Sequence, residues 1–390
     1  MAESLPWTTR LKSVWLAVTA LALLLGGWQR ARAVYALPPD FDEMVYLPAA
    51  FHYRDCLAAK DFACIANYRE NFEHPPLVKV MFAGALALRG ATEPAWENVH
   101  VGKPIPLDAQ AAFFSTRWLS VFFGMAQLAL LACVHPLAAL GLALSTYHSK
   151  YSAQAYLEAV PGLVALAAVV LFERAFRGRR ANSPAPTPVD VGVLLGSAFL
   201  VGLATAGKFP YGLSISLGLA PLLFLRLPQR FGLWVAFAAV ALATFLLFDP
   251  FLWPAPLARL SETLEFHWGF SQSKLVKSSA LPWWQPLFTL THSEPAKWHK
   301  GVFFTSLADW GLLPLALVGL WRTLHRRVVF ASWFLLGLGF LFLWPTKWPQ
   351  YILTLLPAVA VCAALGVETL AEAVWRLALR RKGQGVTPAV

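Results

Sequence analysis

The sequence predicts an all-α, polytopic integral membrane protein, and three observations lead to that fold class. The first is composition: 58% of the 390 residues are hydrophobic and only 14% are charged, whereas about a quarter are charged in soluble proteins. The second is a series of apolar runs long enough to cross a bilayer. The third is that basic residues cluster in short loops between those runs, which is typical of membrane topology signals and disfavours nucleic acid as a partner.

Nine apolar runs have the length of a membrane-spanning helix. They cover residues 13–28, 113–134, 157–176, 191–208, 211–226, 232–252, 302–321, 329–345 and 350–370. The first run follows Arg10 and Lys12 and is predicted to be an uncleaved signal anchor, with a signal peptide cleaved at "ARA" (31–33) as the alternative. Two further pieces, 77–90 and 137–147, reach only ~21 and ~17 Å at ~1.5 Å per residue, against a ~30 Å hydrocarbon core.

Charge clusters orient the chain across the membrane. The positive-inside rule predicts that four basic stretches face the cytoplasm: "RAFRGRR" (174–180), "RLPQR" (226–230), "RTLHRR" (322–327) and "RLALRRK" (376–382). Counting spans between them places both termini in the cytoplasm and requires an even number of crossings between 74 and 156. We therefore expect 77–90 to be a re-entrant or membrane-surface helix, with one bent span over 113–147 as the alternative.

The resulting prediction is a single transmembrane domain over residues 1–390 with about ten transmembrane helices. The first exported loop (29–76) is expected to carry juxtamembrane helices and the catalytic residues. Residues 253–300 form a second exported loop, and 376–390 form a cytoplasmic tail. A short piece at membrane depth is tolerated only beside protein or a water-filled cavity, so 77–90 also indicates a cavity.

The first exported loop concentrates carboxylates directly after the first span. Seven of the chain's 21 acidic residues lie there: Asp40, Asp42, Glu43, Asp55, Asp61, Glu70 and Glu73. Most are expected to be solvated. Asp42 and Glu43 differ because the apolar turn 44–47 draws them towards the membrane surface, where desolvation and the adjacent like charge raise a carboxyl pKa. A raised pKa suits a general base near neutral pH.

A second signal, "NFEHPPLVKV" (71–80), ends the same loop. Pro75 disfavours a helical conformation at His74, and Pro76 is suited to begin a helix. The free backbone N–H groups at such a helix start attract anions, and His74 and Lys79 flank this start. We therefore expect a phosphate at the membrane surface to bind here.

Further cations are predicted on the same face. Arg117 lies at the mouth of a span in "STRWLS", and "YHSKYSAQAYLEAVPG" supplies Lys150 and Glu158. Lys208 in "AGKFPYG" and Lys347 in "PTKWPQY" complete the set. Interfacial snorkelling explains any one of these cations, but cations from four separate segments opposite an acidic pair indicate a cavity that binds an anion.

Such a cavity suits a substrate with its acyl chain in the bilayer and its anionic head among the cations. The cations would stabilise charge on a phosphate leaving group, and a carboxylate would deprotonate an attacking hydroxyl or amine. This combination indicates sugar transfer from a polyprenyl phosphate. A transporter or flippase of lipid-linked sugars is one alternative. A transporter requires ionisable residues at mid-bilayer depth and paired half-helices, and the sequence gives little support for either. A non-catalytic membrane scaffold is the other.

The four cysteines fall into two kinds. Cys133 and Cys362 lie inside apolar runs and are expected to be small core residues. Cys56 and Cys64 lie in the exported loop, where a disulfide is chemically permitted. No cysteine spacing indicates a zinc site.

Several segments together resemble the GT-C glycosyltransferases. The resemblance rests on "DFDEMVY" (40–46), "HPPLVK" (74–79) and "RWLSVFFG" (117–124). Later segments extend it, including "SKYSAQAYLEA" (149–159) and "KWPQYILTLLPAVAVCAALG" (347–366). The branch most similar contains dolichyl-phosphate-mannose–protein mannosyltransferases and aminoarabinose–lipid A transferase.

The resemblance implies an inverting glycosyltransferase, transferring a hexose or a pentose, that acts on the exported face of the inner (plasma) membrane. It implies Asp42 as the base and Glu43 as its partner, with Glu158 at the acceptor or at a metal. The contacts expected to the donor phosphate are His74, Lys79, Arg117, Lys150, Lys208 and Lys347.

The resemblance also bears on the partners and the cofactor, and this sequence departs from the family pattern at one position. The expected partners are a polyprenyl-phosphate sugar donor, membrane lipid, and an acceptor glycan, lipid or protein. Family members differ in metal use, so no cofactor is assigned and a divalent metal is left open. Lys150 stands where many members carry Arg, which removes bidentate phosphate binding.

Overall fold

Helices are the only regular secondary structure in the parts of the chain that this computed structural model describes, residues 5–176, 187–304 and 307–381. This finding confirms the predicted all-α class. Within those ranges, seven helices are long and apolar enough to cross a membrane, so the chain is a polytopic membrane protein. Most of the basic stretch 174–180 and the end of the predicted tail, from 382 onwards, lie outside the described residues.

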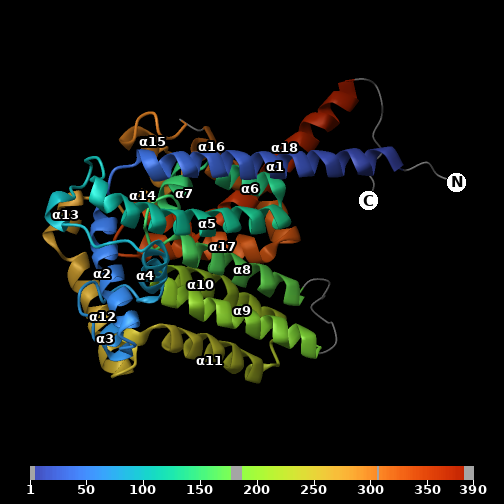
Figure 1. Cartoon of the computed structure of the whole chain (residues 1–390). Helices are drawn as coiled ribbons and strands as arrows, with labels where there is room; N and C mark the ends of the chain where they lie inside the picture. Colours follow the sequence, from blue (N-terminus) through green and yellow to red (C-terminus); the bar gives the residue numbers. More distant parts are fainter. Residues whose placement is uncertain (1–4, 177–186, 305–306, 382–390) are drawn as a thin grey trace.

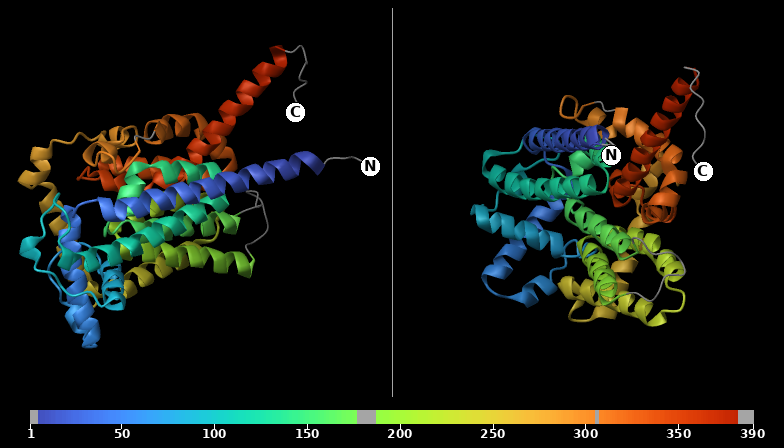
Figure 2. Two further views of the ribbon diagram at one scale, coloured as in Figure 1. Left: turned by 45° about the horizontal axis from the view of Figure 1, so that its top comes forward. Right: turned by 90° about the vertical axis from the view of Figure 1, so that its right-hand side faces the viewer.

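The membrane bundle contains long helices that run side by side (Figures 1 and 2). The seven candidate spans are α1 (Leu5–Ala36), α5 (Gln110–Val134), α8 (Ala159–Phe176), α9 (Pro188–Gly207), α10 (Phe209–Arg226), α11 (Phe231–Phe248) and α18 (Leu356–Arg381). Two more helices pack among them, α16 (Leu307–Arg326) and α17 (Val328–Leu343). α17 is apolar but only 16 residues long.

Shorter helices form a covering layer at one end of the bundle, whereas the terminal ends of α1 and α18 lie at the other end (Figure 1). The layer includes α2 (Phe41–Ala58), α3 (Phe62–Ala66), α4 (Leu77–Arg89), α12 (Pro256–Ser271) and α13 (Lys274–Ser279). The remaining short elements are η1 (Trp96–Asn98), η2 (Leu107–Ala109), α7 (Thr146–Tyr151), η3 (Pro250–Leu252), α14 (Gln285–Thr289), α15 (Glu294–Trp298) and η4 (Pro349–Thr354).

The two short apolar pieces form short helices. The piece 77–90 contains the 13-residue helix α4, which packs against α2 and α5. The piece 137–147 contains α6 (Pro136–Leu144), nine residues long, which packs against α1 and α5. Because α6 folds back on α5, residues 113–147 form a tight helical hairpin and not one bent span. The expected count of about ten crossings stays a prediction.

Local sequence signals fix the positions of two residues near the cavity described below, Glu43 and Lys208. α2 begins with a capping box, in which the Asp40 side chain caps the helix and the Glu43 carboxylate accepts a hydrogen bond from the Asp40 backbone N–H at 3.0 Å. Pro210 lies in the first turn of α10, where its missing N–H donor and fixed φ are tolerated. Lys208 is the single residue between α9 and α10, and its backbone is extended.

Two glycines allow α16 and α18 to approach at backbone distance. A Cβ atom added at Gly366 would lie 2.0 Å from the carbonyl oxygen of Leu315. One added at Gly319 would lie 2.0 Å from the carbonyl oxygen of Cys362. Small residues are the usual means by which membrane helices pack this closely, so this contact tolerates no side chain.

We expect Gly366→Ala to lower the thermal unfolding midpoint of the detergent-solubilised protein, because overpacking of this kind costs about 1–3 kcal/mol. The matched control is Gly339→Ala in α17, where an added Cβ meets nothing within 4 Å. Size-exclusion chromatography after heating measures both midpoints. Equal midpoints for the two variants would contradict the close packing of α16 on α18.

Candidate functional site

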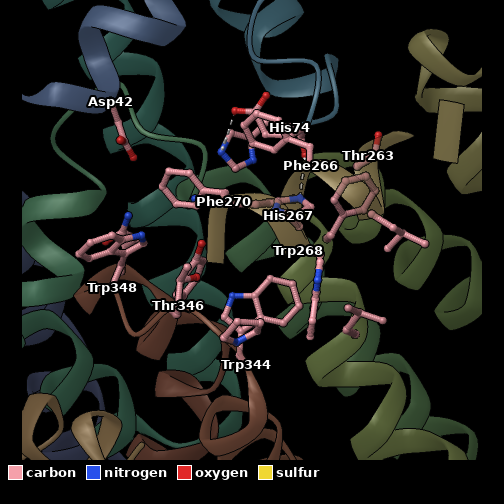
Figure 3. Close-up of a pocket in the computed structure, with 18 of the residues that line it drawn as sticks. Asp42, His74, Thr263, Phe266, His267, Trp268, Phe270, Trp344, Thr346 and Trp348 are labelled. Carbon is pink, nitrogen blue, oxygen red and sulfur yellow. Dashed lines mark hydrogen bonds and ion pairs between the residues drawn. The ribbon is translucent and has the colours of Figure 1, made fainter. Parts of the chain in front are cut away.

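A cavity of about 800 Å³ lies between the covering layer and the bundle. Its wall is built from the first turn of α2, the loop before α4, the α9–α10 junction, α12, and the segment between α17 and η4. Figure 3 shows Asp42 and His74 at the cavity, with His267 and Trp344 from later segments facing the same space. The fold therefore brings together residues that are far apart in the sequence.

The cavity lining is amphipathic. Among the described residues, its ionisable and phenolic side chains are Asp42, Tyr46, Glu73, His74, Lys208, His267 and Tyr351. Its apolar side chains include Phe209, Leu213, Phe245, Leu264, Phe266, Trp268, Phe270 and Trp344. Such a lining accommodates a molecule with a large apolar part and a small polar head.

Asp42 is the acidic residue of the predicted pair that lines the cavity. It lies in the first turn of α2, and Tyr46 one turn later donates a long hydrogen bond to its Oδ2 atom at 3.5 Å. Burial raises the pKa of Asp42 to about 7, an effect that the Lys208 ammonium opposes and the Glu158 carboxylate reinforces. At neutral pH Asp42 is therefore poised between its proton-accepting and protonated forms.

Glu43 points away from the cavity and is fully buried. Its carboxylate forms a bidentate ion pair with Arg117, at 2.8 Å from Nε and 2.6 Å from Nη2. It also accepts a hydrogen bond from the backbone N–H of Ala155 at 2.8 Å. The two adjacent carboxylates, expected to act together, thus lie in different environments.

Arg117, expected to contact the donor phosphate, has no donor left for a ligand. Besides the two bonds to Glu43, it donates to the backbone carbonyls of Val34, Leu37 and Pro38 at 2.8–2.9 Å. These contacts use each of the five N–H donors of the guanidinium group. Arg117 also does not line the cavity. It ties α5 to α2 and to the end of α1.

Lys208 is the expected cation that does line the cavity. Its ammonium group pairs with Glu158, and both side chains are almost completely buried. Glu158 was expected at the acceptor or at a metal, which stays a prediction, and its Oε1 atom accepts a hydrogen bond from Lys208. The Lys208 ammonium also lies 5.7 Å from the centre of the Tyr351 ring. The single-residue connection between α9 and α10 places this ammonium at the cavity wall.

His74 also lines the cavity, as a neutral imidazole. Burial, together with the nearby charge of Lys208, keeps the pKa of His74 well below its ordinary value. Lys79, by contrast, is buried beneath the preceding turn and donates to the Asn71 carbonyl at 3.0 Å and to the His74 carbonyl at 2.9 Å. Its ammonium therefore shapes the loop that presents His74 and does not face the cavity.

Two other expected phosphate contacts are also occupied elsewhere. Lys150 pairs with Asp40 at the start of α2 and lies against the rings of Tyr151 and Tyr156. Lys347 donates to backbone carbonyls at the end of α17, including that of Phe342 at 3.0 Å. Neither lysine lines the cavity. Of the six expected contacts, the cavity holds His74 and Lys208.

The expectation of solvated carboxylates holds for part of the first loop only. Asp55 is 65% exposed, and Glu70 is also exposed. Asp61 is exposed but caps α3, and Asp40 caps α2. Glu73 lines the cavity and is 14% exposed. Solvation was the wrong expectation for Asp40 and Glu73, because an N-cap and a buried loop each give a carboxylate a protein environment.

His267 is a cavity residue that the sequence did not reveal. It lies on α12, 6.2 Å from His74 between ring centres, and its Nε2 atom is 3.2 Å from the Glu73 carbonyl oxygen. Burial lowers the pKa of His267 below its ordinary value. The only signal available in the sequence was its place in "LEFHWGF" (264–270), an amphipathic stretch of a loop predicted to lie near the membrane.

Cys56 and Cys64 form a disulfide that joins α2 to α3, with a Cα–Cα distance of 5.7 Å. His52 lies beside the disulfide, and its Nε2 atom is 3.3 Å from the Cys56 sulfur and 3.4 Å from the Cys64 sulfur. Among the described residues, these three form the one group of His, Cys, Asp and Glu side chains close enough for a metal. Metals bind the thiolate form, and here the sulfurs are bonded to each other. The described cavity residues do not present a set of three metal ligands.

The fold and the site define a polytopic all-α membrane protein with an amphipathic cavity at one end of its bundle. Its fold is similar to crystal structures of ArnT from Cupriavidus metallidurans, with undecaprenyl phosphate bound and in the apo state. The TM-scores are 0.57 and 0.56 at 16% identity, over 97% and 95% of this chain. This similarity confirms the fold that the resemblance to GT-C glycosyltransferases implies.

The chain spans 63% and 62% of the length of those two ArnT chains. No protein-family model matches the sequence, and no curated protein matches it.

We expect Arg117→Met to destabilise the protein strongly, because breaking a buried ion pair leaves Glu43 as an unpaired buried charge and costs about 3–5 kcal/mol. The matched control is Arg69→Met. Arg69 pairs with Glu262 at 2.7 Å, but both side chains are exposed, so its loss costs roughly 0–1 kcal/mol. Thermal unfolding in detergent compares the two. An unfolding midpoint for Arg117→Met as high as that of Arg69→Met would contradict the role of Arg117 in fixing α2 to α5.

Proposed function

We propose that this protein is an inverting glycosyltransferase that moves a sugar from a polyprenyl-phosphate-linked donor to an acceptor at the membrane surface. The observation that carries the proposal is Asp42, whose pKa burial raises to about 7, at the polar end of an otherwise apolar cavity. The similarity in fold to an ArnT structure with bound undecaprenyl phosphate supports the donor class. The exported face of the inner (plasma) membrane is the proposed location of the cavity, because the basic loops mark the opposite face.

The donor is proposed to lie with its acyl chain along the aromatic and aliphatic wall of the cavity. Its phosphate would then reach Lys208, the one cation among the described residues that line the cavity. His74 and His267 are neutral there and present ring nitrogens for hydrogen bonds to phosphate or sugar oxygens. Arg117, Lys79, Lys150 and Lys347 are left out of this contact set because each has partners elsewhere.

The reaction that this arrangement supports is a single displacement. The Asp42 carboxylate takes the proton from the acceptor O–H or N–H as that atom attacks the anomeric carbon of the sugar. The bond from that carbon to the phosphate oxygen breaks, and its electron pair leaves with the polyprenyl phosphate. Attack opposite the leaving group inverts the configuration. Lys208, held by Glu158, stabilises the negative charge that develops on the phosphate.

We expect Asp42→Asn to reduce glycan transfer by about 10²- to 10⁴-fold, the usual contribution of a positioned base, with normal expression and membrane insertion. Asp55→Asn is the matched control, since Asp55 is exposed on the same helix. Mass spectrometry of surface glycans, lipids and proteins from a deletion strain complemented with each variant measures transfer. Full activity of Asp42→Asn would show that another group is the base.

We expect the transfer rate at limiting substrate to rise about tenfold per pH unit below pH 7 and to level off above it, because Asp42 must be deprotonated to act. Lys208 lowers the pKa of Asp42 and Glu158 raises it. Lys208→Met should therefore move the midpoint of the residual activity to higher pH. The double variant Lys208→Met, Glu158→Gln lacks both charges, so the midpoint of its pH profile should shift less than that of Lys208→Met alone. Profiles with equal midpoints in all three proteins would exclude Asp42 as the titrating group.

The transporter alternative makes a different prediction about sidedness. Vesicles with the cavity face outward are supplied with a polyprenyl-phosphate-linked sugar on that outer face. We expect glycosylated acceptor to form there without movement of the donor across the bilayer, because donor and base lie in the same cavity. A flippase would give no product under this condition.

A further inference from the structure

The last part of α18 continues beyond the bundle. Residues up to Gly366 are buried against neighbouring helices, whereas almost every residue from Leu370 to Arg380 is exposed. Figures 1 and 2 show this segment, in red, leaving the bundle at an angle, at the end opposite the covering layer. We term residues 367–380 the α18 arm. Its position far from the cavity separates it from the proposed reaction.

The root of the arm is held by ion pairs to neighbouring helices. Glu368 lies 3.1 Å from Arg322 and 3.0 Å from His135, and Glu372 lies 2.7 Å from the same Arg322. His135 comes directly after the last residue of α5, and Arg322 lies near the end of α16. The cluster therefore marks the level at which these membrane helices end. From Glu368 the arm continues for ~18 Å at ~1.5 Å per residue.

Two stripes run along the arm. The charged stripe recurs every fourth residue and consists of Glu368, Glu372, Arg376 and Arg380. The apolar stripe has helical spacing on the opposite side and consists of Val367, Leu370, Val374 and Leu377. Because Arg322 holds the acidic half of the charged stripe against α16, the apolar stripe faces away from the bundle. Its side chains are between 38% and 66% exposed.

We propose that the α18 arm lies on the membrane leaflet at this end of the bundle and binds anionic phospholipid. The apolar stripe would enter the boundary between head groups and acyl chains, and Arg376 and Arg380 would contact the anionic head groups. The arm continues a membrane helix past the level where its neighbours end, so the lipid surface is the nearest apolar phase. An arm directed into water would leave the whole apolar stripe hydrated, which the hydrophobic effect disfavours.

The test places an environment-sensitive fluorophore on Leu377→Cys in the full-length protein. Cys133, which is exposed and is not the core residue that its apolar run led us to expect, is changed to Ser, while the buried Cys362 and the disulfide remain. In nanodiscs of phosphatidylcholine with phosphatidylglycerol, we expect blue-shifted emission that brominated acyl chains quench and aqueous iodide does not. Because Leu377 is 59% exposed, its replacement leaves the fold intact, and a single size-exclusion peak verifies this.

Charge variants separate lipid binding from simple apolar insertion. Arg376→Gln combined with Arg380→Gln should lower the ratio of docked to free arm by about thirtyfold, since each arginine near an anionic surface contributes roughly fivefold. Its bromolipid quenching should fall to the level measured in phosphatidylcholine alone. Arg226→Gln with Arg230→Gln removes the same charge from another basic loop and should leave the quenching unchanged.

Three results would overturn the proposal. Strong iodide quenching without bromolipid quenching would place the arm in water. Cross-linking between Leu377→Cys copies, in place of lipid quenching, would make a second copy of the chain the partner. Equal bromolipid quenching with and without phosphatidylglycerol would show insertion that does not depend on anionic lipid.

Discussion

The buried ion pair between Glu43 and Arg117 is the interaction on which the candidate site depends. Through Arg117 it fixes the first turn of α2 to α5 and to the carbonyl groups at the end of α1. Both side chains are excluded from solvent, so a shifted α2 would leave two charges without partners in a medium of low polarity. Neighbouring residues on a helix point about 100° apart. Anchoring Glu43 therefore also sets the direction of Asp42, towards the cavity.

The distribution of charge around the cavity reflects the same rule that buried ions need partners. Lys150 is neutralised by Asp40, and Lys208 by Glu158. The histidines that face the cavity carry no charge at neutral pH, because burial and Lys208 disfavour their protonated forms. The cavity therefore contains few charges that lack a partner of opposite sign. In such a medium each remaining charge acts strongly on its neighbours, which explains how Lys208 and Glu158 both influence the pKa of Asp42.

The sequence predicted the helices well because the length of an apolar run depends only on local composition. It also singled out Asp42, since the apolar turn behind it is a local signal, and the structure places Asp42 at the cavity. Partners were harder to predict. The sequence placed cations on one face but did not show that Arg117 would pair with Glu43, 74 residues earlier. His267 reaches the cavity only through the packing of α12, and no local pattern encodes that contact.

The connection between α9 and α10 has a consequence for the tolerance of this chain to insertions and deletions. One residue, Lys208, joins two helices that each cross the bundle. Adding or removing a residue near the end of α9 would rotate Lys208 and α10 by about 100° and shift them by about 1.5 Å. Lys208 would then turn from Glu158 towards a different wall, with no loop to absorb the change. The lengths of α9 and α10 thus determine the position of the Lys208 ammonium group. Length variation in related chains should therefore be confined to the ends of these two helices that lie away from Lys208.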